Sequence, residues 1–301
     1  MMKKTAILFI VEGAGTEPDF LTGVDRTFQL DCDVCSVCAN IHNLYNIIKR
    51  YGFNVNIIDV LKAFFNDNLL ELKNKIASFQ SNLNKKTELK NLKKEQERTE
   101  KDLETLNRKY SSIYLIFDSE FQSQTKNDRN LSQMQIVAKN YKELLEMIEY
   151  FNNETEPTRG KLYLNYPMME SFRHCDYPGD PNFVNAQVSI DLLFKKGEYK
   201  RVVQKQHPKM ASRHPDKFIE EEFVKIAWMN VCKLHTLYAK LWKVPSYKSF
   251  QQQAEQVGIL HQEYNLIVTQ KTISVLNTTL FFLLDYFGKP FYESEIAKIE
   301  A

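Results

Sequence analysis

The sequence lacks several features that identify common classes of protein. It has no run of about 18 apolar residues that would span a bilayer, and the apolar segment Leu280–Leu284 is far too short. The apolar stretch before Glu12 is only about seven residues long and precedes no cleavage site, so we do not expect a signal peptide. The five cysteines are an odd number, which argues against a disulfide framework. We therefore expect a cytoplasmic protein with no membrane segment.

The net charge of the chain does not identify a class of protein either. The 301 residues carry a formal net charge of +2, so nucleic-acid binding is not indicated for the chain as a whole and any basic surface must be local. A hydrophobic content of 43% is sufficient for one large domain or two ordinary ones.

The most informative stretch is residues 7–17, which reads ILFIVEGAGTE. Its apolar half is typical of a strand buried on both faces of an α/β sheet. Gly13 and Gly15 then permit a tight turn with space for a ligand, and we expect Thr16 to cap a helix near Pro18. Ligands of such sheets bind at the carboxyl ends of strands, which is where Glu12 lies. The glycine spacing matches neither GxxxxGK[ST] nor GxGxxG.

Two more apolar runs end in carboxylates. Residues 112–117 precede Asp118 and Glu120, whose spacing of two favours one face of a strand or a shared turn. Residues 162–164 are followed by Asn165 and then by Glu170. Carboxylate oxygens are the ligands of hard divalent ions, so the three strand ends predict a site for Mg²⁺ or Mn²⁺.

These residues resemble a known family. Glu12-Gly13-x-x-Thr16-Glu17-Pro18, then Phe117-Asp118-x-Glu120 and Asn165-x-Pro167-x-x-Glu170, are similar to the RloB-like group of Toprim-domain proteins, which has relatives in bacterial abortive-infection systems. The resemblance covers about residues 4–175. It implies a Toprim fold, metal-dependent phosphodiester chemistry and a role in defence against phage. By position it implies acid/base or metal-binding work for Glu12 and metal binding for Asp118 and Glu120, although Toprim proteins usually have DxD where this chain has DxE.

The predicted architecture is α/β. We expect a Toprim-like small parallel sheet flanked by helices over residues 1–175, with an antiparallel helical hairpin inserted at about 68–110. A mostly helical C-terminal lobe is expected over 176–301. We also expect a strand over residues 55–60 and helices over 19–28, 41–52, 131–151, 183–194, 217–243, 247–256 and 265–287.

The function that these patterns favour is a divalent-metal-dependent nuclease acting on DNA or on host RNA such as tRNA. The alternative is a catalytically latent subunit that docks onto a partner ATPase, with the hairpin as a docking arm or as a contact to a second copy. The predicted catalytic residues are Glu12, Asp118 and Glu120, and the predicted metal ligands are these three with Glu17 and Glu170. Phosphate contacts are predicted from a polar loop and from a basic, proline-containing loop, at Lys126, Arg129, Lys200, Arg201, Lys205, Lys209 and Arg213.

Three further patterns have competing interpretations. Cys32, Cys35 and Cys38 have metal-ligand spacing, and His42 or the His174–Cys175 pair could complete a site in space, but the three cysteines fall where the second strand is expected. His174 is placed to protonate a leaving group, although a lone histidine at a strand end is more often structural. Lysines near the hairpin tip are accompanied by acids such as Glu88 and Glu95, which weakens an argument from charge.

Overall fold

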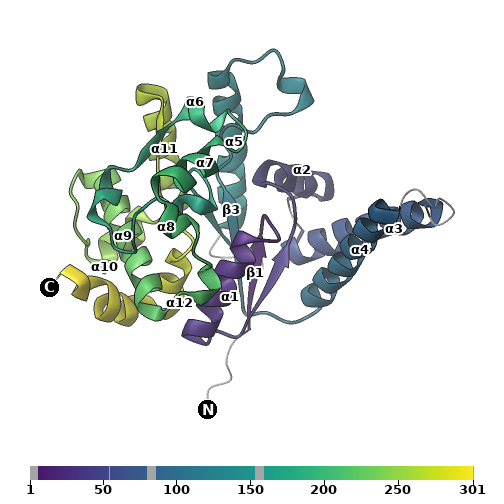
Figure 1. Cartoon of the computed structure of the whole chain (residues 1–301), viewed down its shortest axis with the longest axis horizontal. Coiled ribbons are helices and arrows are strands. Elements are labelled where there is room, and N and C mark those ends of the chain that lie inside the picture. The colour runs from purple at the N-terminus through teal and green to yellow at the C-terminus, as the bar shows by residue number, and fades with distance from the viewer. Residues whose placement is uncertain (1–5, 54, 80–85, 153–158, 301) are drawn as a thin grey trace.

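A four-stranded parallel sheet forms the centre of the computed structural model, which describes residues 6–53, 55–79, 86–152 and 159–300 (Figure 1). The strand order is β2-β1-β3-β4. The strands are β1 (Ile7–Val11), β2 (Cys32–Ser36), β3 (Ser112–Asp118) and β4 (Lys161–Asn165). All five side chains of β1 are buried, because this strand is interior to the sheet and covered on both faces. The predicted α/β class and the parallel sheet flanked by helices are confirmed.

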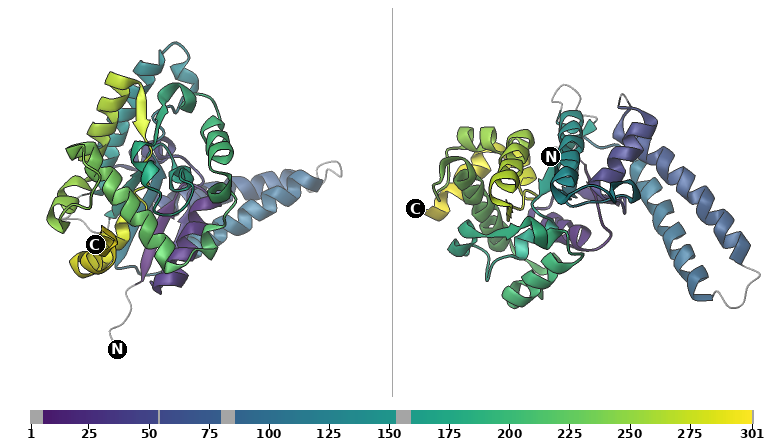
Figure 2. Two further views of the ribbon diagram at one scale, coloured as in Figure 1. Left: turned by 60° about the vertical axis from the view of Figure 1, so that its left-hand side comes forward. Right: turned by 90° about the horizontal axis from the view of Figure 1, so that it is seen from above.

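The connections between strands determine where a ligand can approach. The chain runs from β1 through α1 (Thr16–Phe28) to β2 on one side, and from β3 through α5 (Gln133–Phe151) to β4 on the other. Since such crossovers are right-handed, helices that lead in opposite directions lie on opposite faces of the sheet, as the view from above shows (Figure 2). The neighbouring strands β1 and β3 therefore flank a topological switch point, and ligands of open α/β sheets bind at the carboxyl ends of the strands beside such a point.

An antiparallel helical hairpin projects from the body of the molecule between α2 (Ile41–Tyr51) and β3 (Figures 1 and 2). It consists of α3 (Ile57–Phe79) and α4 (Lys86–Leu106). Leu72 and Ile76 of α3 and Thr99 of α4 are buried along its seam. The hairpin was predicted, but it begins earlier than residue 68. The sequence also places Leu83 on the hydrophobic seam of the hairpin and Lys85 near its tip, and both residues lie outside the described residues.

The C-terminal half is mostly helical and packs against the sheet. Phe282 contacts Phe9 of β1 and Tyr114 of β3 through ring centroids 4.7 and 5.6 Å away. Its elements are η4 (Met169–Arg173), η5 (Pro181–Asn185), β5 (Gln187–Ser189), α6 (Ile190–Leu193), α7 (Glu198–Gln206), α8 (Pro208–Ala211), η6 (Pro215–Lys217), α9 (Glu220–Ala239), α10 (Tyr247–Gln253), α11 (Gln256–Gln270), β6 (Thr272–Ser274), α12 (Phe281–Phe291), the π-helical η7 (Tyr292–Ile296) and η8 (Ala297–Glu300).

Five predictions of local structure were wrong. The expected strand over 55–60 is the start of α3, where the Asn56 side chain accepts a hydrogen bond from the Ile58 amide. The expected helix over 265–287 is interrupted, because Lys271 in a left-handed conformation ends α11 and the following residues form β6. The expected helix over 183–194 is also interrupted, because it contains β5, which pairs with β6. The basic segment, expected as a loop, forms α7 and α8. Thr16 does not cap α1 but is its first residue.

One hydrophobic cluster contains side chains from both halves of the chain, including Phe20 of α1, Phe172 of η4 and Phe223 of α9. The proposed division near residue 176 therefore stays a prediction about organisation and does not correspond to two separate cores. Among the described residues, no helix combines the length and apolarity needed to cross a bilayer.

Candidate metal centre at the carboxyl edge of the sheet

Three carboxylates meet at the switch point. Glu12 directly follows β1 and Asp118 ends β3, so the register that pairs Val11 with Ile116 brings the two ends together. Glu120 follows two residues later in a turn. One oxygen from each of these three side chains lies within 4.8 Å of the others. Two ligands on opposite sides of a Mg²⁺ ion are about 4 Å apart, so small rotations would bring this set onto one ion.

Hydrogen bonds from the main chain orient two of these carboxylates. The Met169 amide donates to Asp118 Oδ1 at 2.6 Å, and the Asp118 amide donates to Glu12 Oε2 at 3.4 Å. Asp118 is only 8% exposed. The strand ends thus hold their carboxylates in place before any ligand binds.

Negative charge in the cluster is poorly compensated by the chain itself. Burial, followed by the charges of Glu120 and Glu17, raises the pKa of Glu12 from 4.5 to about 8, although the Asp118 amide and Lys200 oppose this. Burial and the Glu12 charge raise the pKa of Asp118 well above its usual range. Burial also raises the pKa of Glu120. A donor set of carboxylate oxygens with these properties fits a hard divalent cation such as Mg²⁺ or Mn²⁺.

Glu17 lies beside Gly13, close to this group. A Cβ atom at position 13 would lie 3.0 Å from Glu17 Oε2, so a larger residue there would require the Glu17 carboxylate to shift slightly. Burial raises the pKa of Glu17, and the Glu170 charge adds to the effect. Two of the glutamates predicted as ligands, Glu17 and Glu170, are therefore electrostatic neighbours of the cluster, but they are not among the three oxygens that converge.

Lys200 is a cation that lies beside these acids. Its Nζ is 2.7 Å from Glu170 Oε1, and it lowers the pKa of Glu12, Glu17 and Glu120 from where burial would place them. Burial would lower the pKa of Lys200 itself, but the surrounding carboxylates outweigh it and raise that pKa. The side chain is 54% exposed, and its ammonium is paired with Glu170.

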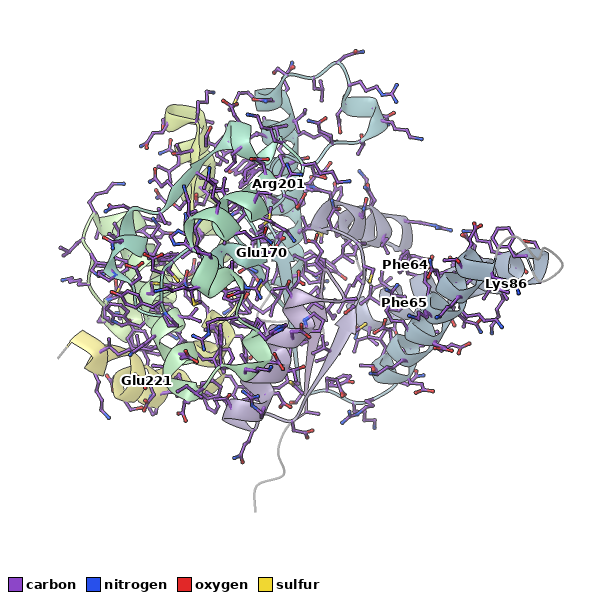
Figure 3. All side chains as sticks on the ribbon, viewed as in Figure 1. Phe64, Phe65, Lys86, Glu170, Arg201 and Glu221 are labelled. Atoms are coloured by element: carbon purple, nitrogen blue, oxygen red, sulfur yellow. The ribbon has the colours of Figure 1, made fainter. Side chains whose placement is uncertain are left out.

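The other predicted phosphate contacts are more distributed. Lys126 and Arg129 are exposed in the loop after Glu120, where η2 (Lys126–Asp128) forms a short turn. Arg201, which follows Lys200 on α7, pairs with Glu198 and is labelled in Figure 3 together with Glu170. Lys205 and Lys209 are exposed, whereas Arg213 is held in an ion pair with Glu222 and over the Phe218 ring. Lys200 is thus the member of the basic segment that reaches the acids.

The cysteine and histidine alternatives find no support in the geometry. Cys32 and Cys35 are three residues apart on β2, so they point to opposite faces, and burial raises the pKa of both thiols. Within the described residues, the group of potential ligands that converges is the acidic one. His174 is buried, with Nδ1 3.3 Å from the Tyr199 hydroxyl, and burial lowers its pKa to about 4. It is neutral at pH 7 and packed as a structural side chain.

Charges of both signs are mixed on the surface of the hairpin, as they are in its sequence. Lys86, Lys90, Lys93 and Lys94 line one surface hollow of α4 together with Glu97. Glu95 lines a different pocket at the hairpin base, which also contains Arg98, Phe64 and Phe65 (Figure 3). The lysines near the tip therefore have an acid beside them, as the sequence pattern predicts.

Sequence reasoning did not connect three residues with the site. His42 of α2, which it considered only as a ligand of a cysteine site, and Asn140 of α5 both contact the Glu120 carbonyl, and Glu143 of α5 contacts His42. Each belongs to an amphipathic helix whose pattern indicates only packing, and nothing in their spacing connects them with Glu120.

Comparison of the chain with family models, with curated proteins and with solved structures finds no match to any of them.

Proposed function

We propose that this chain is a metal-dependent phosphodiesterase that cleaves nucleic acid, with its site at the switch point between β1 and β3. The observation that carries the proposal is the convergence of three carboxylates whose pKa values are raised by burial and, for Glu12 and Asp118, also by the charges of neighbouring carboxylates. Such a cluster disfavours its own charge unless a cation is bound. The Toprim-like identity suggested by the motifs, and with it a role in anti-phage defence, belongs to this proposal.

Glu12, Asp118 and Glu120 would hold Mg²⁺ or Mn²⁺, which when bound supplies positive charge to a phosphodiester oxygen and lowers the pKa of water. The chain's own groups account for the remaining requirements. With a cation bound, Glu12 would be ionised, because the cation removes the cause that raises its pKa in the metal-free chain, and it could then accept a proton from water beside the ion. Lys200, whose ammonium is paired with Glu170, would contribute positive charge to a phosphate next to the acids. Phosphoryl transfer needs positioning and charge more than a nucleophilic side chain.

The second candidate function is a latent subunit regulated by a partner ATPase. It is favoured by the projecting hairpin, whose two long helices have little contact with the rest of the molecule beyond their base (Figure 2). In that case the acids would still bind a cation, but cleavage would require the partner.

The test combines Mn²⁺ titration calorimetry with cleavage of labelled duplex DNA and total tRNA, using the wild type, Glu12→Gln and Asp118→Asn. Glu263→Gln is the matched control, because Glu263 is also a buried carboxylate with a pKa raised by burial, to about 7, yet lies in the C-terminal half. We expect both site variants to lose Mn²⁺ binding and cleavage and the control to retain them. Metal binding without cleavage would favour the latent subunit, and absence of metal binding by the wild type would refute the proposal.

A further inference from the structure

The conformation of Glu120 requires support from outside its own turn. Its φ is +46°, in the left-handed region of backbone conformation that residues other than glycine rarely adopt. Glu120 nevertheless contributes one of the three converging carboxylates. Its main chain must therefore be held in place by neighbouring groups if the carboxylate is to face Glu12 and Asp118.

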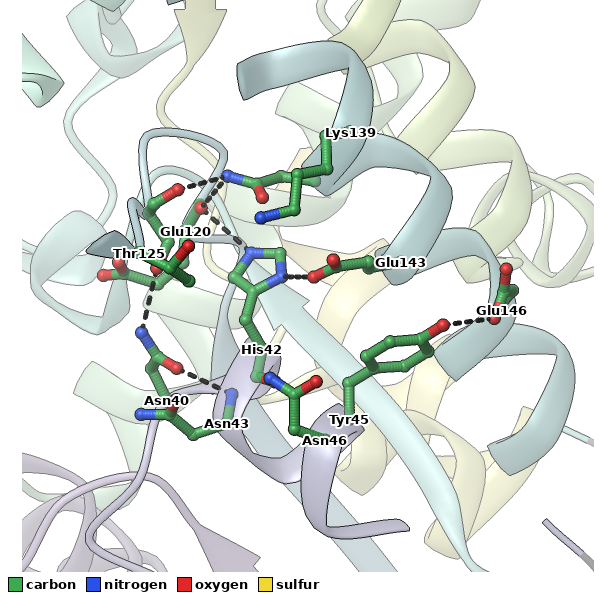
Figure 4. A network of polar contacts seen from close by, with 12 residues as sticks. Asn40, His42, Asn43, Tyr45, Asn46, Glu120, Thr125, Lys139, Glu143 and Glu146 are labelled. Atoms are coloured by element: carbon green, nitrogen blue, oxygen red, sulfur yellow. Dashed lines mark hydrogen bonds and ion pairs between the residues drawn. The ribbon is translucent and has the colours of Figure 1, made fainter. Parts of the chain in front are cut away.

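Side chains of two helices, α2 and α5, supply that support by donating hydrogen bonds to carbonyl oxygens of the turn (Figure 4). The Glu120 carbonyl accepts hydrogen bonds from His42 Nε2 at 3.1 Å and from Asn140 Nδ2 at 3.4 Å, besides the Ser123 amide at 2.9 Å. Because a carbonyl oxygen only accepts, His42 Nε2 is the donor. The Asn140 amide also donates to the carbonyls of Phe121 at 2.9 Å and Ser123 at 2.8 Å, so a single buried side chain binds three carbonyls of one turn.

The donors are themselves fixed. His42 Nδ1 lies 2.7 Å from Glu143 Oε2, and the imidazole is almost fully buried. Asn140 and Glu143 are neighbours on α5, one turn apart. His42 is in the first turn of α2, whose N-cap residue Asn40 accepts from the Asn43 amide and donates to Ser123 Oγ at 3.2 Å. The helices α2 and α5 thus converge on the turn that carries Glu120.

We propose that His42, Asn140 and Glu143 are positioning residues that fix the main chain of Glu120 and thereby aim its carboxylate at the metal centre. The consequence for the metal rests on the proposed function, whereas the support of the turn does not. Partners of this kind beside a metal ligand typically change metal affinity by about 10- to 100-fold when removed.

Two substitutions of His42 separate positioning from simple packing. The side-chain amide of glutamine reaches the position of Nε2 and that of asparagine the position of Nδ1. His42→Gln therefore keeps the donor to the Glu120 carbonyl, while His42→Asn keeps the contact to Glu143 and loses that donor. A role in packing alone predicts that the two variants behave alike.

The experiment measures amide hydrogen exchange over residues 119–124 without metal and Mn²⁺ affinity by calorimetry, for both variants and for Asn140→Ala. Asp128→Asn is the control, because Asp128 ties the same loop to Thr125 and to Lys139 without touching Glu120. We expect His42→Asn and Asn140→Ala to exchange faster and to bind Mn²⁺ at least about 10-fold more weakly. His42→Gln and Asp128→Asn should stay within a few-fold of the wild type.

Unchanged exchange at residues 119–124 in His42→Asn and Asn140→Ala would overturn the proposal, and so would equal Mn²⁺ affinities for the glutamine and asparagine variants. If the wild type binds no Mn²⁺, the proposed function fails, and hydrogen exchange alone decides whether the support of the turn is real. His42→Gln is the variant chosen to fold in every case, since it retains the hydrogen bond to the turn.

Discussion

Neutralising Glu12 should change how the stability of the metal-free protein depends on pH. The pKa of Glu12 rises from 4.5 to about 8 in the folded chain, which corresponds to about 5 kcal/mol when the group is fully ionised. Between these two values the folded state keeps a proton that the unfolded state has lost. Stability is therefore complete below pH 4.5 and falls as pH rises towards 8, by at most about 1.4 kcal/mol per pH unit for this group.

Urea unfolding at pH 6.5 and 7.5 in EDTA tests this. We expect the free energy of unfolding of the wild type to fall over this interval by about 1 kcal/mol more than that of Glu12→Gln. His174, whose pKa is lowered from 6.5 to about 4, and Lys233, whose pKa is lowered to about 8, are present in both proteins, so their contributions cancel in the difference. Glu263 titrates within it but is present in both proteins, so its contribution cancels.

Equal pH dependence in the two proteins would refute the argument that the acids are buried against one another. Adding Mn²⁺ to the wild type should flatten the dependence, because cation binding favours the ionised carboxylates and releases their protons. Glu12→Gln should show a smaller response to Mn²⁺.

Two further perturbations follow from the packing and from the charge of the site. Gly23→Ala places a Cβ atom 2.5 Å from the Pro215 carbonyl oxygen, so we expect thermal unfolding to report a loss of stability of about 1–2 kcal/mol. Thr22→Ala at the adjacent exposed position controls for helix propensity. An unchanged unfolding midpoint for Gly23→Ala would contradict the contact. Lys200→Ala removes a cation that lowers the pKa of the acids around it, so we expect the free energy of unfolding to fall by at most about 1 kcal/mol at pH 8 and by less at pH 6. Lys205→Ala is the control. An equal effect of Lys200→Ala at both pH values would count against this role.

The sheet and the meeting of the acids were predictable because both depend on local signals. An apolar run followed by glycine marks β1, and parallel strands bring their carboxyl ends to one edge, so Glu12 and Asp118 were expected together. The failures lie where tertiary contacts decide between alternatives. The branched residues at 55–60 suit a strand by composition, but Asn56 starts a helix there and its buried positions follow a helical period.

Burial and charge around the site were less predictable. Lys200 was identified as part of a basic loop, and only the helix α7 brings it to Glu170. His42 lies 78 residues before Glu120 in the sequence. A contact of that kind between a helix and a turn leaves no periodic signal in the sequence, so the sequence pattern does not predict it.

The helical hairpin also affects how the sheet can form. The central strands β1 and β3 are adjacent, yet Ala6 and Ser111, which are bonded beside them, are 105 residues apart. The helices α3 and α4 contain 23 and 21 residues of that interval and pair mainly with each other. If they form first, the loop to be closed is shorter by roughly half, which saves about 0.6 kcal/mol of closure entropy. The arm that extends furthest from the sheet therefore lowers the entropic barrier to assembling its two central strands.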